Sequence, residues 1–259
     1  MLKGFAEEER DDLPLVNRLR ADVKRWRELD YESASPVTKQ LLRYWARTDR
    51  PRRLFFCQRE AVETIIYLNE ILGSGRKPRW KPELSVEDFQ ALCAGQKPSF
   101  SIETKLGIFP SLADLPNEPG LLPLRRYGCK MATGSGKTVV MAMLMAWAFC
   151  NRGRVPGDTR FPNAVLVVCP NLTIKERLQV LRPENPDNYY EAFDLVPAQL
   201  RPELRQGEGV GHELAFVRAA GGQSGGRGPA VATVILASRN DHFLRARYGR
   251  VDSARAMVN

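Results

Sequence analysis

One short run in the sequence combines residue types that can bind and activate a phosphate group. Gly134 and Gly136 flank Ser135, and Lys137 and Thr138 follow directly. The glycines let the backbone turn so that successive N–H groups point inward, and a helix that begins near Lys137 adds its positive end. A lysine here reaches the β- and γ-phosphates, and a threonine hydroxyl binds Mg²⁺. The spacing therefore predicts a phosphate-binding loop for a nucleoside triphosphate with Mg²⁺.

The neighbouring segments have the patterns of elements that position such a loop. Residues 121–129 are typical of a short strand leading into a tight turn, and the apolar run 139–150 is typical of a buried helix. The strict pattern G-x-x-x-x-G-K-[ST] asks for glycine where Met131 stands, so this loop, which includes Thr133, is a variant. The alternative is a glycine turn before an ordinary helix. The joint occurrence of strand, turn, Gly-Lys-Thr and helix favours the loop.

Composition and charge narrow the class of protein. The chain has 259 residues, of which 43% are hydrophobic, which is enough for a globular core. Its longest apolar run, 139–150, is shorter than the ~20 residues that a membrane span needs. Residues 1–9 show no hydrophobic targeting segment, so we expect a cytoplasmic protein without a membrane partner. The net charge of +9 favours a polyanionic partner such as nucleic acid.

Cysteines and histidines give no sign of a protein-built metal site. The 5 cysteines are far apart in sequence and form no C-x-x-C pair, so we expect reduced thiols. His212 and His242 are isolated from each other and from acidic clusters. Any metal should therefore arrive with the nucleotide.

The N-terminal part of the chain predicts helices. Residues 12–30 carry apolar side chains at helical spacing on a basic background. A second helix is expected from Pro36 to about Ala46, because Ser35 can cap it and proline suits the first turn. We interpret residues 1–50 as a helical N-terminal region. A solvated packing helix is favoured over DNA contact for the basic segment.

The variant loop M-A-T-G-S-G-K-T resembles motif I of the superfamily 2 helicases and translocases. These proteins place an aromatic-rich turn and a glutamine before a helix upstream of the loop. Gln58 fits that position, because the apolar spacing after it predicts a helix that begins there. The resemblance implies that the Gln58 amide reads the adenine edge with one donor and one acceptor, with Phe55 or Phe56 near the base. The alternative is an exposed glutamine at a helix start.

Residues 73–120 are expected to form an insertion between the glutamine and the loop. They are rich in glycine and proline, with one short helix predicted over 86–92 and capped by Ser85. Trp80 lies among basic residues and suits either stacking on a base or pinning a loop to the core. No function can be assigned to this segment from its residues.

A fully apolar strand is predicted over Ala164 to Cys169, which would complete a βαβ unit with the loop helix. The string after it, residues 170–178, resembles motif Ia, which contacts the nucleic-acid backbone in this superfamily. Asn171, Thr173 and Lys175 are the side chains suited to phosphate oxygens. Capping of the next helix by Asn171 or Thr173 is the alternative.

Two further strings, residues 55–68 and 181–205, narrow the resemblance. They are similar to the helicase domain of the restriction subunit of type III restriction enzymes, which are ATP-driven DNA translocases and nucleases. The resemblance covers about residues 12–205 and implies an α/β fold, with a partial RecA-like P-loop domain over 51–206. It also implies ATP and Mg²⁺ as cofactors, and DNA and a modification (methyltransferase) subunit as partners. The rival hypotheses are an unrelated P-loop ATPase or kinase and a non-catalytic nucleotide-binding remnant.

The resemblance ends near Arg205. Residues 207–259 are rich in glycine, alanine and arginine and have one strand-like run, 231–236, so we expect an irregular tail. The carboxylate pair that holds Mg²⁺ in such enzymes is not found, since Asp241 has no acidic neighbour. A second ATPase domain, with its arginine finger, and a nuclease domain are not recognised either. Without later strands, the edge of the strand near 165–168 is expected to stay uncovered.

A frameshift near Gln206 would explain the change. Reading the degenerate codons of Glu208 to Gly222 from the second base allows an apolar strand that ends in Thr-Asn-Trp-His-x-Phe. This product resembles the segment that the family carries next. The alternative is a natural short protein with a divergent glycine-rich end.

Overall fold

The computed structural model describes residues 13–75, 78–100, 125, 127–169, 171–205, 213–218 and 233–237. The chain divides into two compact units. Unit 1 comprises Met1–Ala34 and Glu60–Lys130, and unit 2 comprises Ser35–Arg59 and Met131–Asn259. The segment around Gln58 therefore groups with the glycine loop, whereas the sequence suggested boundaries near residues 50 and 206.

Unit 1 is built from helices packed through aromatic side chains. The helix predicted over 12–30 is α2, Pro14–Glu28, and the predicted short helix is α5, Val86–Cys93, with the Ser85 hydroxyl accepting from the Asp88 N–H. The helix predicted to begin at Gln58 is α4, Phe56–Ile66, which starts two residues earlier and continues into the π-helix η1 (Tyr67–Leu72). The Tyr67 ring is buried and stacks on Trp80 at 6.4 Å between centroids. Trp80 thus attaches its loop to the core, which agrees with the second of the two roles expected for it, packing rather than stacking on a base.

The long helix α6, Lys137–Arg154, forms the centre of unit 2. Almost every side chain from Val139 to Asn151 is buried, and α6 packs against α3 (Pro36–Ala46), α8 (Tyr189–Ala192) and α9 (Arg201–Arg205). Ser35 caps α3 as expected, since its hydroxyl accepts from the Thr38 N–H at 2.9 Å. Thr38 in turn accepts from the side chains of Trp147 and Asn151, both at 3.0 Å. These buried hydrogen bonds join α3 to the loop helix.

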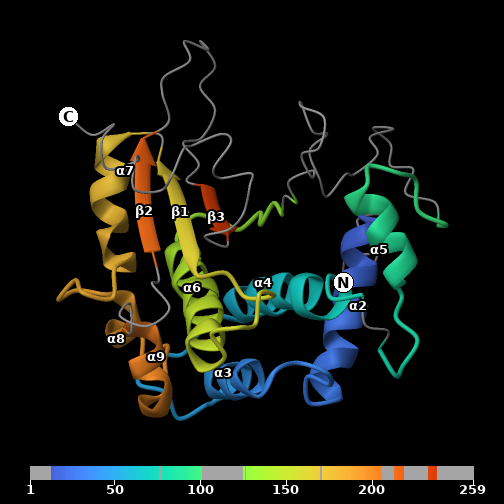
Figure 1. Ribbon diagram of the computed structural model, residues 1–259, viewed down its shortest axis with the longest axis horizontal. Helices are drawn as coiled ribbons and strands as arrows, with labels where there is room; N and C mark the ends of the chain where they lie inside the picture. Colours follow the sequence, from blue (N-terminus) through green and yellow to red (C-terminus); the bar gives the residue numbers. More distant parts are fainter. Residues whose placement is uncertain are drawn as a thin grey trace, which may run out of the picture. The chain divides into compact units, whose positions relative to one another are not determined.

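A three-stranded sheet completes unit 2. The strand predicted over 164–169 is β1, Ala164–Cys169, and Figure 1 shows it between β2 (Glu213–Arg218) and β3 (Thr233–Ala237). β2 pairs in parallel with β1 and β3 pairs antiparallel, so that Val165 is opposite both Leu214 and Leu236. The expected uncovered edge near 165–168 is therefore wrong. Both of its sides are paired, because the tail supplies two segments rich in apolar and β-branched residues.

The strand that the sequence predicted directly before the glycine loop is not observed in the described residues. Of the residues predicted as a strand, 121–129, residues 127–129 have no regular structure and Arg125 forms an isolated bridge, while 121–124 and 126 lie outside the described residues. The predicted βαβ unit is therefore confirmed only for its helix and its second strand. The chain is α/β in the described part, with a mixed sheet rather than a fully parallel one.

The remaining elements follow β1 in the chain. They are α7 (Leu172–Arg177), the 3₁₀ turns η2 (Leu178–Leu181) and η3 (Ala198–Leu200), and the already named α8 and α9. Among the described residues, no helix combines the length and the apolar character that crossing a membrane requires.

Candidate nucleotide-binding site

The glycine loop has the backbone conformation that its sequence predicts. Gly134 and Gly136 have φ values of 78° and 80°, a region that favours glycine, and α6 begins at the next residue, Lys137. No side chain caps this helix start. The first N–H groups of α6 and the positive end of its dipole are therefore available to an anion.

Polar groups of the loop are drawn toward one carbonyl group. The Ala132 oxygen accepts from the Lys137 ammonium at 2.8 Å and from the Ser135 hydroxyl at 2.7 Å. Lys137 is exposed and Thr138 is half-buried on the first turn of α6, while Thr133 is exposed in the turn before it. A phosphate that recruits Lys137 must replace its bond to Ala132. Because this bond joins an exposed lysine to a neutral acceptor, a charged phosphate can outcompete it.

Gln58 lies against the loop, 77 positions away in sequence from Ser135. Its Nε2 donates to the Ser135 carbonyl at 2.9 Å, and its Oε1 accepts from the Phe55 N–H at 2.9 Å. Gln58 is 4% exposed, so the alternative of an exposed helix-start glutamine is wrong. The φ of 80° at Gly136 favours glycine, and a Cβ there would lie 2.1 Å from Nε2, so that a side chain at this position would displace the Gln58 amide from its hydrogen bonds.

The two bonds of Gln58 define the donor and acceptor ends of its amide. Each end keeps capacity for one more hydrogen bond, because an amide nitrogen carries two hydrogens and an amide oxygen two lone pairs. The neighbouring rings of Phe55 and Phe56 are 59% and 61% exposed. Exposed aromatic rings beside a fixed donor–acceptor pair suit a planar heterocyclic base.

The proposed DNA-contacting side chains lie on a different segment. Asn171 precedes α7 and its Oδ1 accepts from the Ile174 N–H at 2.9 Å, which confirms the capping alternative for this residue. Thr173 is exposed and Lys175 is half-buried, and both lie in α7 after the end of β1. A DNA role for these three residues stays a prediction. Asp241, His212 and His242 lie outside the described residues.

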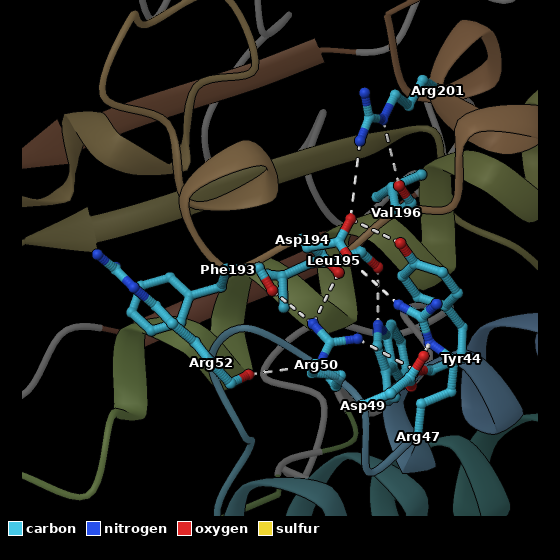
Figure 2. Close-up of polar contacts among 11 residues, drawn as sticks. Tyr44, Arg47, Asp49, Arg50, Arg52, Phe193, Asp194, Leu195, Val196 and Arg201 are labelled. Carbon is cyan, nitrogen blue, oxygen red and sulfur yellow. Dashed lines mark hydrogen bonds and ion pairs between the residues drawn. The ribbon is translucent and has the colours of Figure 1, made fainter.

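Sequence reasoning missed a polar cluster that Figure 2 shows. Arg50 is 5% exposed and contacts the turn at residues 193–195, while the carboxylate of Asp194 accepts from the Tyr44 hydroxyl at 2.6 Å. In the sequence, residues 49–53 have the pattern of a solvated charged run. Asp194 has a left-handed φ of 47°, and the residues around it do not predict this conformation. No signal in the sequence therefore indicates the contact between Arg50 and this turn.

A glycine loop that opens onto an uncapped helix, with an amide at its side, defines a site of the P-loop class. Residues 111–197, about a third of the chain, match the model of the family described as type III restriction enzyme, res subunit. The match includes the loop, α6, β1 and the segment up to α8, and it confirms the resemblance to this family within residues 111–197. Gln58 lies outside the match. Comparison with curated proteins and comparison with solved structures each give no match.

Proposed function

We propose that unit 2 binds ATP with Mg²⁺ and is the nucleotide-binding part of an ATP-dependent DNA helicase or translocase of the type III restriction kind. The observation that carries this proposal is the hydrogen bond from Gln58 to the Ser135 carbonyl, at 2.9 Å. It joins the turn suited to a base and the loop suited to phosphates in one site. The alternative, a glycine turn before an ordinary helix, does not predict this contact.

Each residue has a role that follows from its chemistry. The backbone N–H groups from Thr133 to Gly136 surround the phosphates, Lys137 binds the β- and γ-phosphates, and Thr138 offers its hydroxyl to Mg²⁺. The remaining donor and acceptor of Gln58 meet the adenine edge. Mg²⁺ would neutralise phosphate charge in this site. The residues fit this ligand, because the helix start is uncapped and Lys137 is exposed.

The proposal that the protein acts on DNA is supported by the family match and by the net charge, and not by a contact within the site. The family match and the net charge of +9 both favour a polyanionic partner. We place the DNA contacts at Asn171, Thr173 and Lys175, and a modification (methyltransferase) subunit is the protein partner that the family implies. The cytoplasm is the compartment in which such an enzyme would meet DNA.

One observation favours a binding role without turnover. Enzymes of this kind hold Mg²⁺ with a carboxylate that follows an apolar strand of the sheet. Here β1 is followed by Pro170-Asn171 and the parallel strand β2 by Ala219-Ala220-Gly221-Gly222. Neither of the two parallel strands in the described part of the chain is followed directly by a carboxylate. A frameshift near Gln206 would account for this, and we propose it as the origin of residues 207–259.

Nucleotide selectivity tests the proposal. The dissociation constants of Mg·ATP and Mg·GTP are measured by calorimetry for the 259-residue chain and for Gln58→Ala. The parent should prefer ATP, because guanine reverses donor and acceptor, and Gln58→Ala should reduce that preference by about tenfold, the effect of about one hydrogen-bond mismatch. Equal ATP and GTP affinities in the parent, or an unchanged preference in the variant, would contradict the adenine role.

A further inference from the structure

Arg50 is a buried arginine whose hydrogen bonds go to main-chain carbonyl groups (Figure 2). Its guanidinium donates to the carbonyl oxygens of Asp194 at 2.7 Å, Tyr44 at 3.1 Å and Arg52 at 3.4 Å, and also to that of Phe193. Arginine is seldom buried unless its donors are satisfied, and this one is 5% exposed. The side chain therefore fixes the positions of three backbone segments relative to one another.

The neighbouring carboxylate is engaged by other groups. The Asp194 carboxylate accepts from the Tyr44 hydroxyl at 2.6 Å and from Arg47 at 3.1 Å, and it lies 3.7 Å from Arg201. Burial lowers the pKa of Arg50, and the nearby charge of Asp194 acts in the opposite direction. Arg50 thus contributes mainly through directed hydrogen bonds to backbone oxygens rather than through a close ion pair.

The turn that Arg50 holds is itself anchored to α3. Asp194 has a left-handed φ of 47°, and the following residue, Leu195, accepts from the Trp45 indole at 2.7 Å. The Leu195 N–H donates to the Tyr190 carbonyl at 2.8 Å. Trp45 and Leu195 are almost fully buried, so this turn is held in place by the core. Through Arg50 it can fix the position of residues 50–55.

A short stretch of chain connects this support to the nucleotide site. The Arg52 carbonyl is bonded to Arg50, and the Arg52 guanidinium lies 5.3 Å from the centre of the Phe193 ring. Three residues later, the Phe55 N–H donates to Gln58, which in turn donates to Ser135 of the loop. Hydrogen bonds and a short covalent stretch thus link the 193–195 turn to the glycine loop.

We infer that Arg50 is a positioning residue for adenine selectivity, because it fixes the segment that carries Phe55 and Gln58 to the turn at Phe193 and Asp194. This inference rests on the proposed function. Loss of the carbonyl contacts lets the segment 51–55 shift, and the amide of Gln58 then loses its defined orientation toward a base. The phosphates are bound by the loop and by α6, so their binding does not depend on Arg50.

The test compares Arg50→Met with Arg53→Met in the full 259-residue chain. Both changes remove a guanidinium and keep an unbranched side chain, but Arg53 is exposed on the same segment. Calorimetry gives the dissociation constants of Mg·ATP, Mg·GTP and inorganic tripolyphosphate for the parent and for each variant. Circular dichroism and thermal melting establish that each variant is folded. Arg50→Lys serves as a second variant, since an ammonium keeps the charge but not the planar set of donors.

Arg50→Met should bring the ATP and GTP affinities to within about twofold of each other, while tripolyphosphate affinity stays within about twofold of the parent. Arg53→Met should retain the parental preference. If Arg50→Met does not fold, the same loss of preference in Arg50→Lys supports the inference. A folded Arg50 variant that keeps the full preference overturns it.

The outcome also separates this inference from the proposed function. A parent chain that shows no ATP preference, or a Gln58→Ala variant that keeps one, refutes the adenine site and this inference with it. A selective parent that loses its preference in Gln58→Ala but keeps it in the Arg50 variants refutes only the role of Arg50. A parallel loss of ATP and tripolyphosphate affinity in Arg50→Met would show a general structural role and would also overturn the inference.

Discussion

Each of the two units contains an arginine whose guanidinium points into the fold, and the two guanidinium groups donate to different kinds of acceptor. In unit 1, the Arg27 guanidinium donates to the carboxylate of Glu63, which is 2% exposed and also accepts from the Tyr31 hydroxyl at 3.0 Å. The hydrogen bond to Glu63 raises the pKa of Arg27. In unit 2, Arg50 donates to four carbonyl groups, and burial lowers its pKa.

The difference separates two uses of an arginine that makes directed hydrogen bonds inside the fold, one half-buried and one buried. A pair of opposite charges that are removed from water makes each partner dependent on the other, so breaking the pair affects stability. An arginine that binds carbonyl groups sets the path of the backbone, and here that path leads to Gln58 and the loop. We therefore expect changes in unit 1 to alter stability and changes around Arg50 to alter nucleotide selectivity.

The largest expected effect concerns turnover. Unit 2 contains the proposed phosphate-binding loop, but hydrolysis also needs a carboxylate for Mg²⁺, a group that orients water and a cation such as an arginine finger, the last alone contributing ~10³ to 10⁵ in rate. We predict that the 259-residue chain hydrolyses ATP no faster than its Lys137→Ala variant, with or without DNA. A phosphate-release assay checks this. Steady DNA-stimulated hydrolysis that depends on Lys137 would show that the chain contains the missing groups.

The second prediction concerns the ion pair of unit 1. Glu63→Ala removes the carboxylate to which Arg27 donates, and breaking such a pair costs about 3 to 5 kcal/mol when both partners are buried. Since the Arg27 side chain is 27% exposed, we expect a value near the lower end. Urea unfolding measures the change. The ATP-to-GTP affinity ratio of the folded variant should equal that of the parent.

A matched control lies one turn earlier on α4. Glu60 is 3.7 Å from Arg20, whose side chain is 59% exposed, so Glu60→Ala should cost less than about 1 kcal/mol. Equal losses of stability in Glu60→Ala and Glu63→Ala would mean that burial does not distinguish the two pairs. The ion pair between Arg27 and Glu63 would then contribute no more to stability than an exposed pair does.

The smallest expected effect depends on pH. Asp22 accepts from the N–H groups of Glu83 and Leu84, at 2.6 Å and 2.9 Å, yet burial raises its pKa from 3.8 to about 6. The folded state then holds a proton that the unfolded state releases. The stabilising contribution of this group is therefore fully present below pH 3.8 and is lost as the pH rises through about 6.

Asp22→Asn removes the titration, at the expense of one of the two backbone hydrogen bonds. The difference in unfolding free energy between parent and variant should therefore change by about 2 kcal/mol between pH 4 and pH 7, with the parent losing more stability. Urea unfolding at several pH values measures this difference. A difference that stays constant with pH would assign the slope to other carboxyl groups.

Local signals in the sequence account for the parts that were predicted well. Ser35 and Ser85 cap the helices expected of them, and Gly136 marks the start of α6, because each of these features acts within three or four residues. The strand β1 follows from an unbroken apolar run. Gln58 was proposed as a site residue through a family resemblance, and that role stays a prediction. Its burial against Ser135 depends on a contact that local patterns do not encode.

Long-range contacts account for what the sequence could not predict. Arg50 and Asp194 are 144 positions apart, and an arginine-rich run gives no sign that one member turns inward. The grouping of α3 with α6 depends on Thr38, whose hydroxyl is bonded to two side chains more than 100 positions away. The pairing of β2 and β3 with β1 is also non-local, so a glycine-rich tail was expected to be irregular.

The most direct test of the account is the affinity of the chain for Mg·ATP with and without Lys137. Calorimetry compares the parent with Lys137→Ala and with Lys39→Ala, a half-buried lysine on α3 of the same unit. Lys137→Ala should weaken binding by about 1.5 to 3 kcal/mol, the contribution of a charge-assisted hydrogen bond, which is roughly tenfold to a hundredfold in affinity. Lys39→Ala should bind as the parent does. Unchanged Mg·ATP affinity in a folded Lys137→Ala variant would contradict the assignment of a nucleotide site to this loop.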